Sequence, residues 1–188
     1  MPDLSADVSV RPAGVEDAEP IAGIQAAAWR TAYTELLPGE LLDALDSAEA
    51  VEQWRASVAA PPSPHHRVLV ALAGGTPVGF AAVAPSEDAD AEEEDAELTA
   101  LCVAPGHTGQ GHGSRLVNAA VDHLRGDGFR RVRVWLSTHG RTDDDVRRFL
   151  AGAGWEPDGA QRSLDLYGDS TLVVAQQRLS ATIDGPAP

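Results

Sequence analysis

A glycine-rich segment joins an apolar strand to an amphipathic helix in the middle of this 188-residue chain. The apolar run at residues 98–103 is followed by Pro105, and glycines then stand at positions 109, 111 and 113. Apolar residues recur at helical spacing over residues 116–124. Glycines let a backbone turn its amide hydrogens into a concave nest, and a helix N-terminus adds about half a positive charge. The segment therefore predicts an anion site that suits a phosphate group.

Hydrophobic periodicity predicts strands and helices in mixed order along the rest of the chain. The order is one strand, two helices, three strands, a helix, a strand, a helix and two strands, which indicates a layered α/β (α+β) fold rather than strict alternation. Strands are expected near residues 8–10, 68–72, 78–82, 98–103, 132–136, 163–167 and 171–178, and helices are expected to begin near Asp17, Ser47, Ser114 and Thr142.

Composition narrows the class of protein further. A chain of this length with 43% apolar residues suits one domain, expected over residues 1–180. All fourteen basic residues are arginine, which excludes chemistry that needs a lysine amine. The lone Cys102 excludes an internal disulfide and a multi-thiolate metal site. The six histidines lack metal-ligand spacing, so no metal is expected.

Nothing in the sequence indicates export or a membrane. The first ten residues lack the basic and apolar regions of a signal peptide, so the cytoplasm is the expected location. The uncharged stretch 68–86 carries Gly74, Gly75 and Pro77 inside it, which predicts a β-hairpin instead of a membrane span.

Two segments are expected to lack fixed structure. Eight acidic residues and no basic ones lie in residues 87–97, without apolar periodicity, so residues 87–96 are predicted to form a flexible acidic surface loop. The Pro- and Ala-rich end, residues 181–188, is predicted to be a disordered tail.

A dinucleotide-binding fold is the first alternative for the glycine segment. That fold needs a G-x-G-x-x-G fingerprint and an acidic residue at the end of the second strand. Here the glycines fall at every second position, and Ser137 and Thr138 follow the next predicted strand. The spacing disfavours this alternative.

Residues 103–113 (VAPGHTGQGHG) resemble the acetyl-CoA-binding segment of the GNAT superfamily of N-acetyltransferases, with the pattern V-x-P-x-x-Q/R-x-x-G-x-G/A. Thr108 stands at the Gln/Arg position of that pattern. Residues 149–155 (FLAGAGW) are similar to the family's F-Y-x-x-x-G-F/W, and residues 29–38 to the W-R-x-x-Y-x-x-x-L-P of one bacterial branch.

The resemblance implies a fold and a co-substrate. The implied fold is a mixed, mostly antiparallel central sheet of about seven strands flanked by about four helices, and the implied co-substrate is acetyl-CoA. The residues that the resemblance implies for binding acetyl-CoA are Leu101, Cys102, Val103, Thr108, Gly109, Gln110, Gly111, His112, Gly113, Ser114, Arg115, Asp143 and Phe149.

Acetyl transfer to an amine needs a base, because an alkylamine with a pKa of about 10.4 is mostly protonated at neutral pH. Glu97 precedes Gly111 by 14 residues, the spacing of the general base in the family's histone-modifying branch. Strand alternation is expected to place Glu97 on the face of Leu101 and Val103, with Cys102 on the opposite face as a core residue. A solvated surface charge is the alternative for Glu97.

The leaving thiolate needs a proton donor. The family's tyrosine is replaced by Leu150, which cannot donate, so Tyr33, Ser137 and His139 become the candidates, with Tyr33 the catalytic choice. Asp143 stands where the family often has an asparagine near the pantetheine, and a helix-capping charge is its alternative role.

Charge is distributed unevenly along the chain, whose net charge is −15. Positive charge gathers in residues 107–148, so the 3′-phosphate of CoA is expected to meet arginines there. The acidic remainder favours a cationic small-molecule or peptide amine as acceptor and disfavours nucleic acid. The arginine candidates for the 3′-phosphate are Arg115, Arg141, Arg147 and Arg148.

The sequence thus predicts an acetyl-CoA-dependent N-acetyltransferase that acts by direct attack of a primary amine, with Glu97 as base through water. A homodimer is plausible by resemblance. One alternative is a non-catalytic acyl-CoA-binding sensor or interaction module, and another is an interaction protein with no CoA site.

Overall fold

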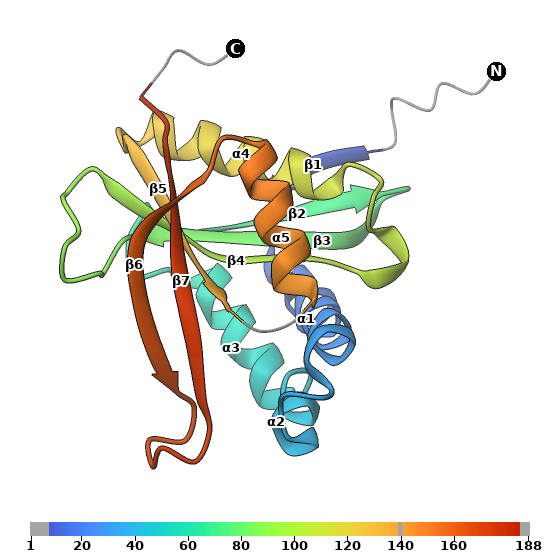
Figure 1. The fold of residues 1–188 in the computed structure, drawn as a ribbon. Coiled ribbons are helices and arrows are strands. Elements are labelled where there is room, and N and C mark those ends of the chain that lie inside the picture. Colours follow the sequence, from blue (N-terminus) through green and yellow to red (C-terminus); the bar gives the residue numbers. More distant parts are fainter. Residues whose placement is uncertain (1–7, 139–140, 185–188) are drawn as a thin grey trace.

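Seven strands form one sheet in the computed structural model, which describes residues 8–138 and 141–184 (Figure 1). The strand order is β1-β2-β3-β4-β5-β7-β6, and every neighbouring pair is antiparallel except β4 and β5. The strands are β1 (Val8–Pro12), β2 (Arg67–Ala73), β3 (Thr76–Pro85), β4 (Asp95–Val103), β5 (Arg131–Ser137), β6 (Glu156–Asp165) and β7 (Val173–Thr182). The predicted mixed, mostly antiparallel sheet is confirmed.

Helices cover both faces of the sheet. The α-helices are α1 (Ala18–Tyr33), α2 (Gly39–Ala44), α3 (Ala48–Ala59), α4 (His112–Gly126) and α5 (Arg141–Gly152), and short 3₁₀ turns are Val15–Asp17 and Pro105–His107. The short α2 is the helix that periodicity did not indicate, because six residues are too few to show a repeat.

Two apolar clusters hold the layers together. On one face, Leu116, Leu124 and Leu150 of α4 and α5 pack with buried residues of the strands. On the other face, Ile21 and Ile24 of α1 pack on Phe80, and Trp54 of α3 joins them. The sheet is therefore the middle layer, with α4 and α5 packed on one face and α1 and α3 on the other.

The sheet is weakest between β4 and β5. Their parallel pairing covers three residue pairs, from Asp95 with Arg131 to Glu97 with Arg133. Both strands continue beyond this point, to Val103 and Ser137, without further pairing between them among the described residues. The two strands thus diverge past Glu97.

The acidic segment is shorter and better anchored than the sequence indicates. Asp95 and Ala96 lie in β4 and are buried, so the expectation that residues 87–96 form a surface loop is wrong at these two positions. The remaining connection, residues 86–94, is called the acidic loop below. Asp88 in this loop bonds to side chains of β5 and β7, a long-range partnership that local composition does not reveal.

The C-terminal end also departs from expectation. Ala181 and Thr182 belong to β7, and Ile183 is 3% exposed in the core. The Ile183 amide donates to the Arg130 carbonyl at 2.7 Å. The predicted disordered tail is therefore wrong for residues 181–183, because strand pairing and one apolar side chain hold them, and residues 185–188 lie outside the described residues.

Candidate active site

The glycine segment forms a left-handed turn that leads directly into α4. Gly109 and Gly111 have φ of 72° and 82°, values that favour glycine, and Gly111 is the residue before the first helical position. The first-turn amide hydrogens of residues 112–114 have no capping side chain among the described residues.

Side chains of the same segment stabilise the turn. The Thr108 hydroxyl donates to the Pro105 carbonyl at 3.2 Å, and the Gln110 amide donates to the Gly106 carbonyl at 3.2 Å. Arg115 donates to the Gln110 carbonyl at 3.3 Å. Thr108 thus has a role inside the loop although it replaces the family's Gln or Arg.

Gly113 and His112 of the glycine segment are closely packed against neighbouring side chains. A Cβ added at Gly113 would meet the Phe149 ring at 3.7 Å, so α4 and α5 approach each other here. His112 is buried beside His107, with ring centroids 6.0 Å apart, and burial lowers the pKa of His112. Ser114 is exposed in the first turn.

The arginines expected near the 3′-phosphate differ in the protein groups that they already bind. Arg147 donates to the Ser137 carbonyl at 3.0 Å and pairs with Asp144 at 2.8 Å. Arg148 pairs with Asp145. The Arg141 side chain lies outside the described residues. Of the three arginine side chains that the structure describes, Arg115 is the one that contacts the glycine segment itself.

A β-bulge on β4 changes which side chains share a face. Ala82 pairs with Ala100 but Val83 pairs with Leu98, so Thr99 is an extra residue in the strand. Leu101 and Val103 pack on the α4 side, whereas Cys102 packs on the α1 side.

The bulge overturns the predicted alternation for Glu97. The Glu97 side chain lines a pocket together with Trp54 of α3, which belongs to the same cluster as Cys102. Glu97 and Cys102 are therefore on the same face of the sheet, and Leu101 and Val103 are on the other. Simple alternation fails because one inserted residue reverses the order of the faces.

The pocket beside Glu97, called the Glu97 pocket, has a volume of about 670 Å³. It lies between α3, the β2–β4 strands, the acidic loop and β6, and Glu97 stands where β4 and β5 stop pairing. Its lining residues are Trp54, Ser57, Pro62, His66, Arg67, Val68, Ala82, Val83, Ala84, Pro85, Glu87, Asp88, Glu97, Thr99 and Arg162.

The electrostatic environment suits Glu97 to proton transfer. Burial raises the pKa of Glu97, and the charges of Asp88 and Glu87 raise it further, against the opposite effects of Arg162 and Arg178. A carboxylate with a raised pKa is a stronger base than an exposed glutamate. This arrangement argues against the alternative of a solvated surface charge.

Tyr33 and Asp143 meet at the end of the sheet where β4 and β5 have diverged. The Tyr33 hydroxyl donates to Asp143 Oδ1 at 2.7 Å, linking α1 to α5 across the two layers. Burial raises the pKa of Tyr33, and Asp143 adds to the effect. Burial also raises the pKa of Asp143, against hydrogen bonds from Tyr33 and Ser137. Asp143 is 5% exposed, so it is a buried polar partner rather than a surface capping charge.

Cys102, Leu150 and Ser137 are the other candidate side chains that the structure describes. Burial raises the pKa of Cys102 to about 12, which suits a core thiol rather than a nucleophile. Leu150 is fully buried in the core on the α4 side. Ser137 ends β5 and bonds to Asp143, whereas His139 lies outside the described residues.

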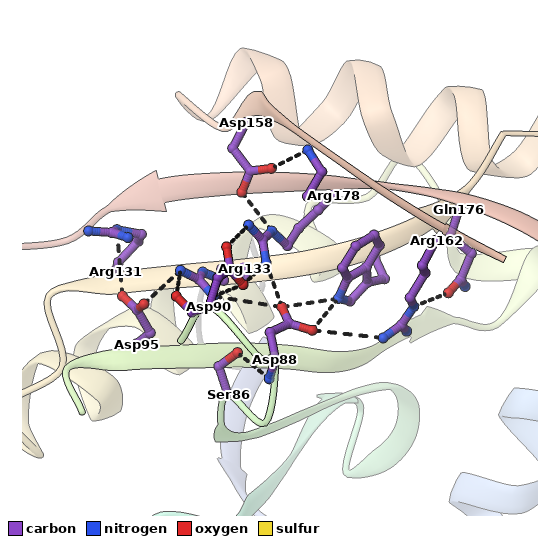
Figure 2. Close-up of polar contacts among 12 residues, drawn as sticks. Ser86, Asp88, Asp90, Asp95, Arg131, Arg133, Asp158, Arg162, Gln176 and Arg178 are labelled. Atoms are coloured by element: carbon purple, nitrogen blue, oxygen red, sulfur yellow. Dashed lines mark hydrogen bonds and ion pairs between the residues drawn. The ribbon is translucent and has the colours of Figure 1, made fainter. Parts of the chain in front are cut away.

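Sequence reasoning missed a network of arginines and aspartates beside the Glu97 pocket (Figure 2). Asp88 accepts from the Trp135 indole at 3.1 Å and from Arg178 at 2.9 Å. Arg178 also pairs with Asp90 and Asp158, each at 2.7 Å. No local motif announces these contacts, because their residues come from β5, β6, β7 and the acidic loop.

Comparison with known proteins places the chain in a family. The sequence model of the acetyltransferase (GNAT) family matches residues 26–155. An N-acetyltransferase of Bacillus subtilis (strain 168), YuaI, itself uncharacterized, is 31% identical over 130 residues, which is 69% of this chain and 71% of that protein. The chain belongs to the acetyltransferase (GNAT) family. It is an N-acetyltransferase whose co-substrate is acetyl-CoA, as the sequence predicts.

Solved structures show the same fold. The yncA protein of Salmonella typhimurium, solved with its cofactor acetyl-CoA, has a TM-score of 0.72 at 18% identity, with 97% of each chain covered. A GCN5-related N-acetyltransferase from Rhodopseudomonas palustris has a TM-score of 0.69 at 21% identity, covering 94% of this chain and 96% of that one. The PaiA N-acetyltransferase of Thermoplasma acidophilum, solved with coenzyme A, has a TM-score of 0.66 at 16% identity, covering 90% and 97%.

Two further observations concern only the part of the chain that the structure describes. None of its helices has the length and apolarity needed to cross a membrane. Within residues 8–138 and 141–184, no group of histidine, cysteine, aspartate and glutamate side chains is arranged to hold a metal ion.

Proposed function

We propose that this enzyme acetylates a cationic primary amine by direct attack, with Glu97 as the general base through a water molecule. The observation that carries the proposal is the position of the Glu97 carboxylate. It lines a pocket at the point where β4 and β5 diverge, and its surroundings raise its pKa. The overall negative charge of the chain supports an acceptor that arrives as an ammonium ion.

The proton balance of the reaction assigns a task to Glu97. An ammonium group loses a proton through water to Glu97, and the free nitrogen attacks the thioester carbonyl carbon. The new nitrogen–carbon bond forms, the carbon–sulfur bond breaks, and the second proton of the nitrogen passes to water, which restores the proton that Tyr33 gives to the thiolate. Holding both reactants in one cleft supplies much of the rate.

The leaving thiolate takes its proton from Tyr33 in this proposal. Leu150 is buried and has no proton to give, whereas the Tyr33 hydroxyl lies beside Cys102 of β4 and is oriented by Asp143. The raised pKa of Tyr33 keeps the hydroxyl protonated at neutral pH, so a proton is present when the thiolate leaves. Asp143 accepts the hydrogen bond that orients the Tyr33 hydroxyl, and the tyrosinate left after transfer regains its proton from water.

The binding of acetyl-CoA is assigned to the backbone of the glycine segment. The two left-handed glycines and the uncapped start of α4 fit a diphosphate, and Arg115 adds a positive charge beside it. The acetyl carbonyl oxygen accepts a hydrogen bond from a backbone amide of β4 near Cys102 or Val103. This part of β4 no longer pairs with β5.

Replacement of Glu97 by glutamine tests the assignment. Glu97→Gln should lower kcat/KM by about 10²- to 10⁴-fold, the usual contribution of a general base, while the affinity for acetyl-CoA is unchanged. Thiol release over a panel of primary amines gives the rate, and calorimetry gives the affinity. Glu94→Gln is the matched control, because Glu94 is an exposed carboxylate on the same segment outside the pocket.

The stability of the variant separates catalysis from folding. Because burial of the charged form raises the pKa of Glu97, the ionised side chain destabilises the fold above that pKa. Glu97→Gln should therefore melt at the same or a higher temperature at pH 7. Full activity in Glu97→Gln would remove Glu97 from the mechanism, and the absence of thiol release with every amine would leave an acyl-CoA sensor as the better description.

A further inference from the structure

Two of the charged residues that line the Glu97 pocket are bound by other protein groups. Arg67 donates through one nitrogen to both oxygens of Asp127, each at 2.7 Å. Asp88 accepts from Trp135 and Arg178. These two pocket residues are therefore not free to take a ligand of opposite charge.

Polar but uncharged groups of the pocket are also engaged. The Thr99 hydroxyl donates to the Ala82 carbonyl at 3.2 Å, and the Ser57 hydroxyl donates to the Gln53 carbonyl at 2.9 Å. The Trp54 indole of the same lining donates to Gln25 at 3.0 Å. The Nδ1 atom of His66 is likewise hydrogen-bonded to the Ser63 hydroxyl, at 2.8 Å. The remaining charged groups are therefore the strongest candidates for recognising a ligand in this pocket.

Arg162 is the exception among the pocket cations. Its Nε donates to Gln176 at 2.7 Å, and within the described part of the chain neither of its terminal nitrogens makes a hydrogen bond. The contact of one terminal nitrogen with Asp88 is 4.0 Å, beyond hydrogen-bonding distance. The side chain is 41% exposed, so its terminal donors are open to a ligand.

The guanidinium of Arg162 is held in one orientation. It stacks over the Trp135 ring, 4.2 Å from the ring centroid. Gln176 accepts a hydrogen bond from the Nε of Arg162, as Figure 2 shows. Trp135 is in turn fixed by its indole bond to Asp88. A planar guanidinium that is already oriented loses little freedom when it binds a carboxylate through two parallel hydrogen bonds.

Glu97 and Arg162 therefore give the pocket two groups of opposite charge, neither of which is hydrogen-bonded to a group of opposite charge among the described residues. Glu97 accepts no hydrogen bond among the described residues, and the positive charge of Arg162 acts on it within the same pocket. Glu87, the other acidic residue of the lining, is exposed. A ligand that matches this pattern carries an ammonium group at one end and an anionic group at the other.

We propose that Arg162 is a specificity-determining residue that binds a carboxylate of the acceptor, so that the acceptor is an amino-acid-like zwitterion rather than a polyamine. The proposal rests on the proposed function, because it takes the Glu97 pocket as the acceptor site. The amine of the zwitterion then faces Glu97 while its carboxylate accepts from the terminal nitrogens of Arg162.

Matched acceptors test this proposal without any variant. Thiol release from acetyl-CoA is measured for a panel of L-α-amino acids, for their primary carboxamides and for the corresponding amines without a carboxyl group. The carboxylate form of at least one side-chain type should be preferred over its carboxamide by about 10- to 100-fold in kcat/KM, the range expected for a charge-assisted hydrogen-bonded pair. Equal or better use of all the uncharged analogues would overturn the proposal.

An arginine variant assigns the preference to one side chain. Arg162→Gln, measured at a pH where Glu97 is ionised in both proteins, should raise KM for the carboxylate acceptor by a similar factor and raise KM for the carboxamide much less, with the affinity for acetyl-CoA unchanged. Arg55→Gln, which removes an exposed arginine of α3 that does not line the Glu97 pocket, is the control. Equal losses for the carboxylate and carboxamide forms in Arg162→Gln would show that Arg162 supports structure only.

The outcomes separate this proposal from the proposed function. Suppose that only amines without a carboxylate are acetylated and that Glu97→Gln abolishes this activity. The proposal that Glu97 is the general base is then supported, and the proposal that Arg162 binds a carboxylate is wrong. If no amine is acetylated, the proposed function itself fails.

Discussion

At the scale of single residues, the charge next to Glu97 sets the pH at which the proposed base is deprotonated. Burial and the negative charge of Asp88 both raise the pKa of Glu97. A base must be deprotonated to act, so kcat/KM should fall as the pH is lowered through this raised pKa. Asp88 and Glu87 of the acidic loop thus act on the ionisation of Glu97 through their charge.

Asp88→Asn should move the acidic limb of the pH profile to lower pH. Removing a negative charge from the pocket makes ionisation of Glu97 easier and lowers its pKa. The measurement is kcat/KM against pH at saturating acetyl-CoA. Asp90→Asn is the control, because Asp90 pairs with the same Arg178 and is not among the charges that act on Glu97. An unmoved limb in Asp88→Asn would contradict the electrostatic account.

Tyr33→Phe addresses the other proton of the reaction. Loss of the hydroxyl should lower kcat by about tenfold or more, with a smaller change in KM, because the thiolate would then depend on water for its proton. The leaving thiolate is the same whichever amine is the acceptor. The loss of kcat in Tyr33→Phe should therefore be similar for all amines. An unchanged kcat would assign the Tyr33–Asp143 hydrogen bond to the joining of α1 and α5 alone.

At the scale of elements, the strand-to-helix turn depends on two backbone conformations that side chains oppose. Gly111→Ala forces a side chain onto a residue with φ of 82°, and the new Cβ lies 3.3 Å from an Arg115 terminal nitrogen. The strain alone is about 1–3 kcal/mol, so the affinity for acetyl-CoA measured by calorimetry should fall by about tenfold. Gly126→Ala at the far end of α4, where nothing lies within 4 Å, should bind normally.

How far the sequence predicts the molecule is also decided by its elements. The glycine turn and the helix after it are predicted because their signals are local, as positive φ and helical periodicity are properties of adjacent residues. The faces of β4 were wrongly predicted because the bulge at Thr99 depends on pairing with β3, which a strand's own residues do not show. The partners of Asp88 were missed for the same reason, since they come from strands far along the chain.

At the scale of the whole molecule, a buried ion pair stabilises the short pairing between β4 and β5. The pairing of β4 with β5 covers three residue pairs, and Asp95 and Arg133 form an ion pair of 2.7 Å there, each side chain 2% exposed. The acidic loop adds Asp90, which bonds to Arg133 and Arg178. The strands on either side of the divergence are thus held together at one end only.

Asp95→Ala should destabilise the fold strongly. Arg133 would lose its closest carboxylate and remain buried, which costs about 3–5 kcal/mol of unfolding free energy. Chemical denaturation measures the loss. Glu94→Ala, which removes the exposed neighbour paired with Arg130, should change the same free energy by less than about 1 kcal/mol. Similar values for the two variants would show that the buried pair contributes little.

The guanidinium groups of this junction have a consequence for an enzyme that modifies amines. Each cation beside the Glu97 pocket is an arginine, which keeps its proton at every pH where the fold survives and is a poor nucleophile toward thioesters. A lysine at any of these places would present a substrate-like nitrogen to the enzyme's own reagent. Built this way, the catalyst offers no side-chain amine for self-modification, and turnover leaves its internal charge pairs intact.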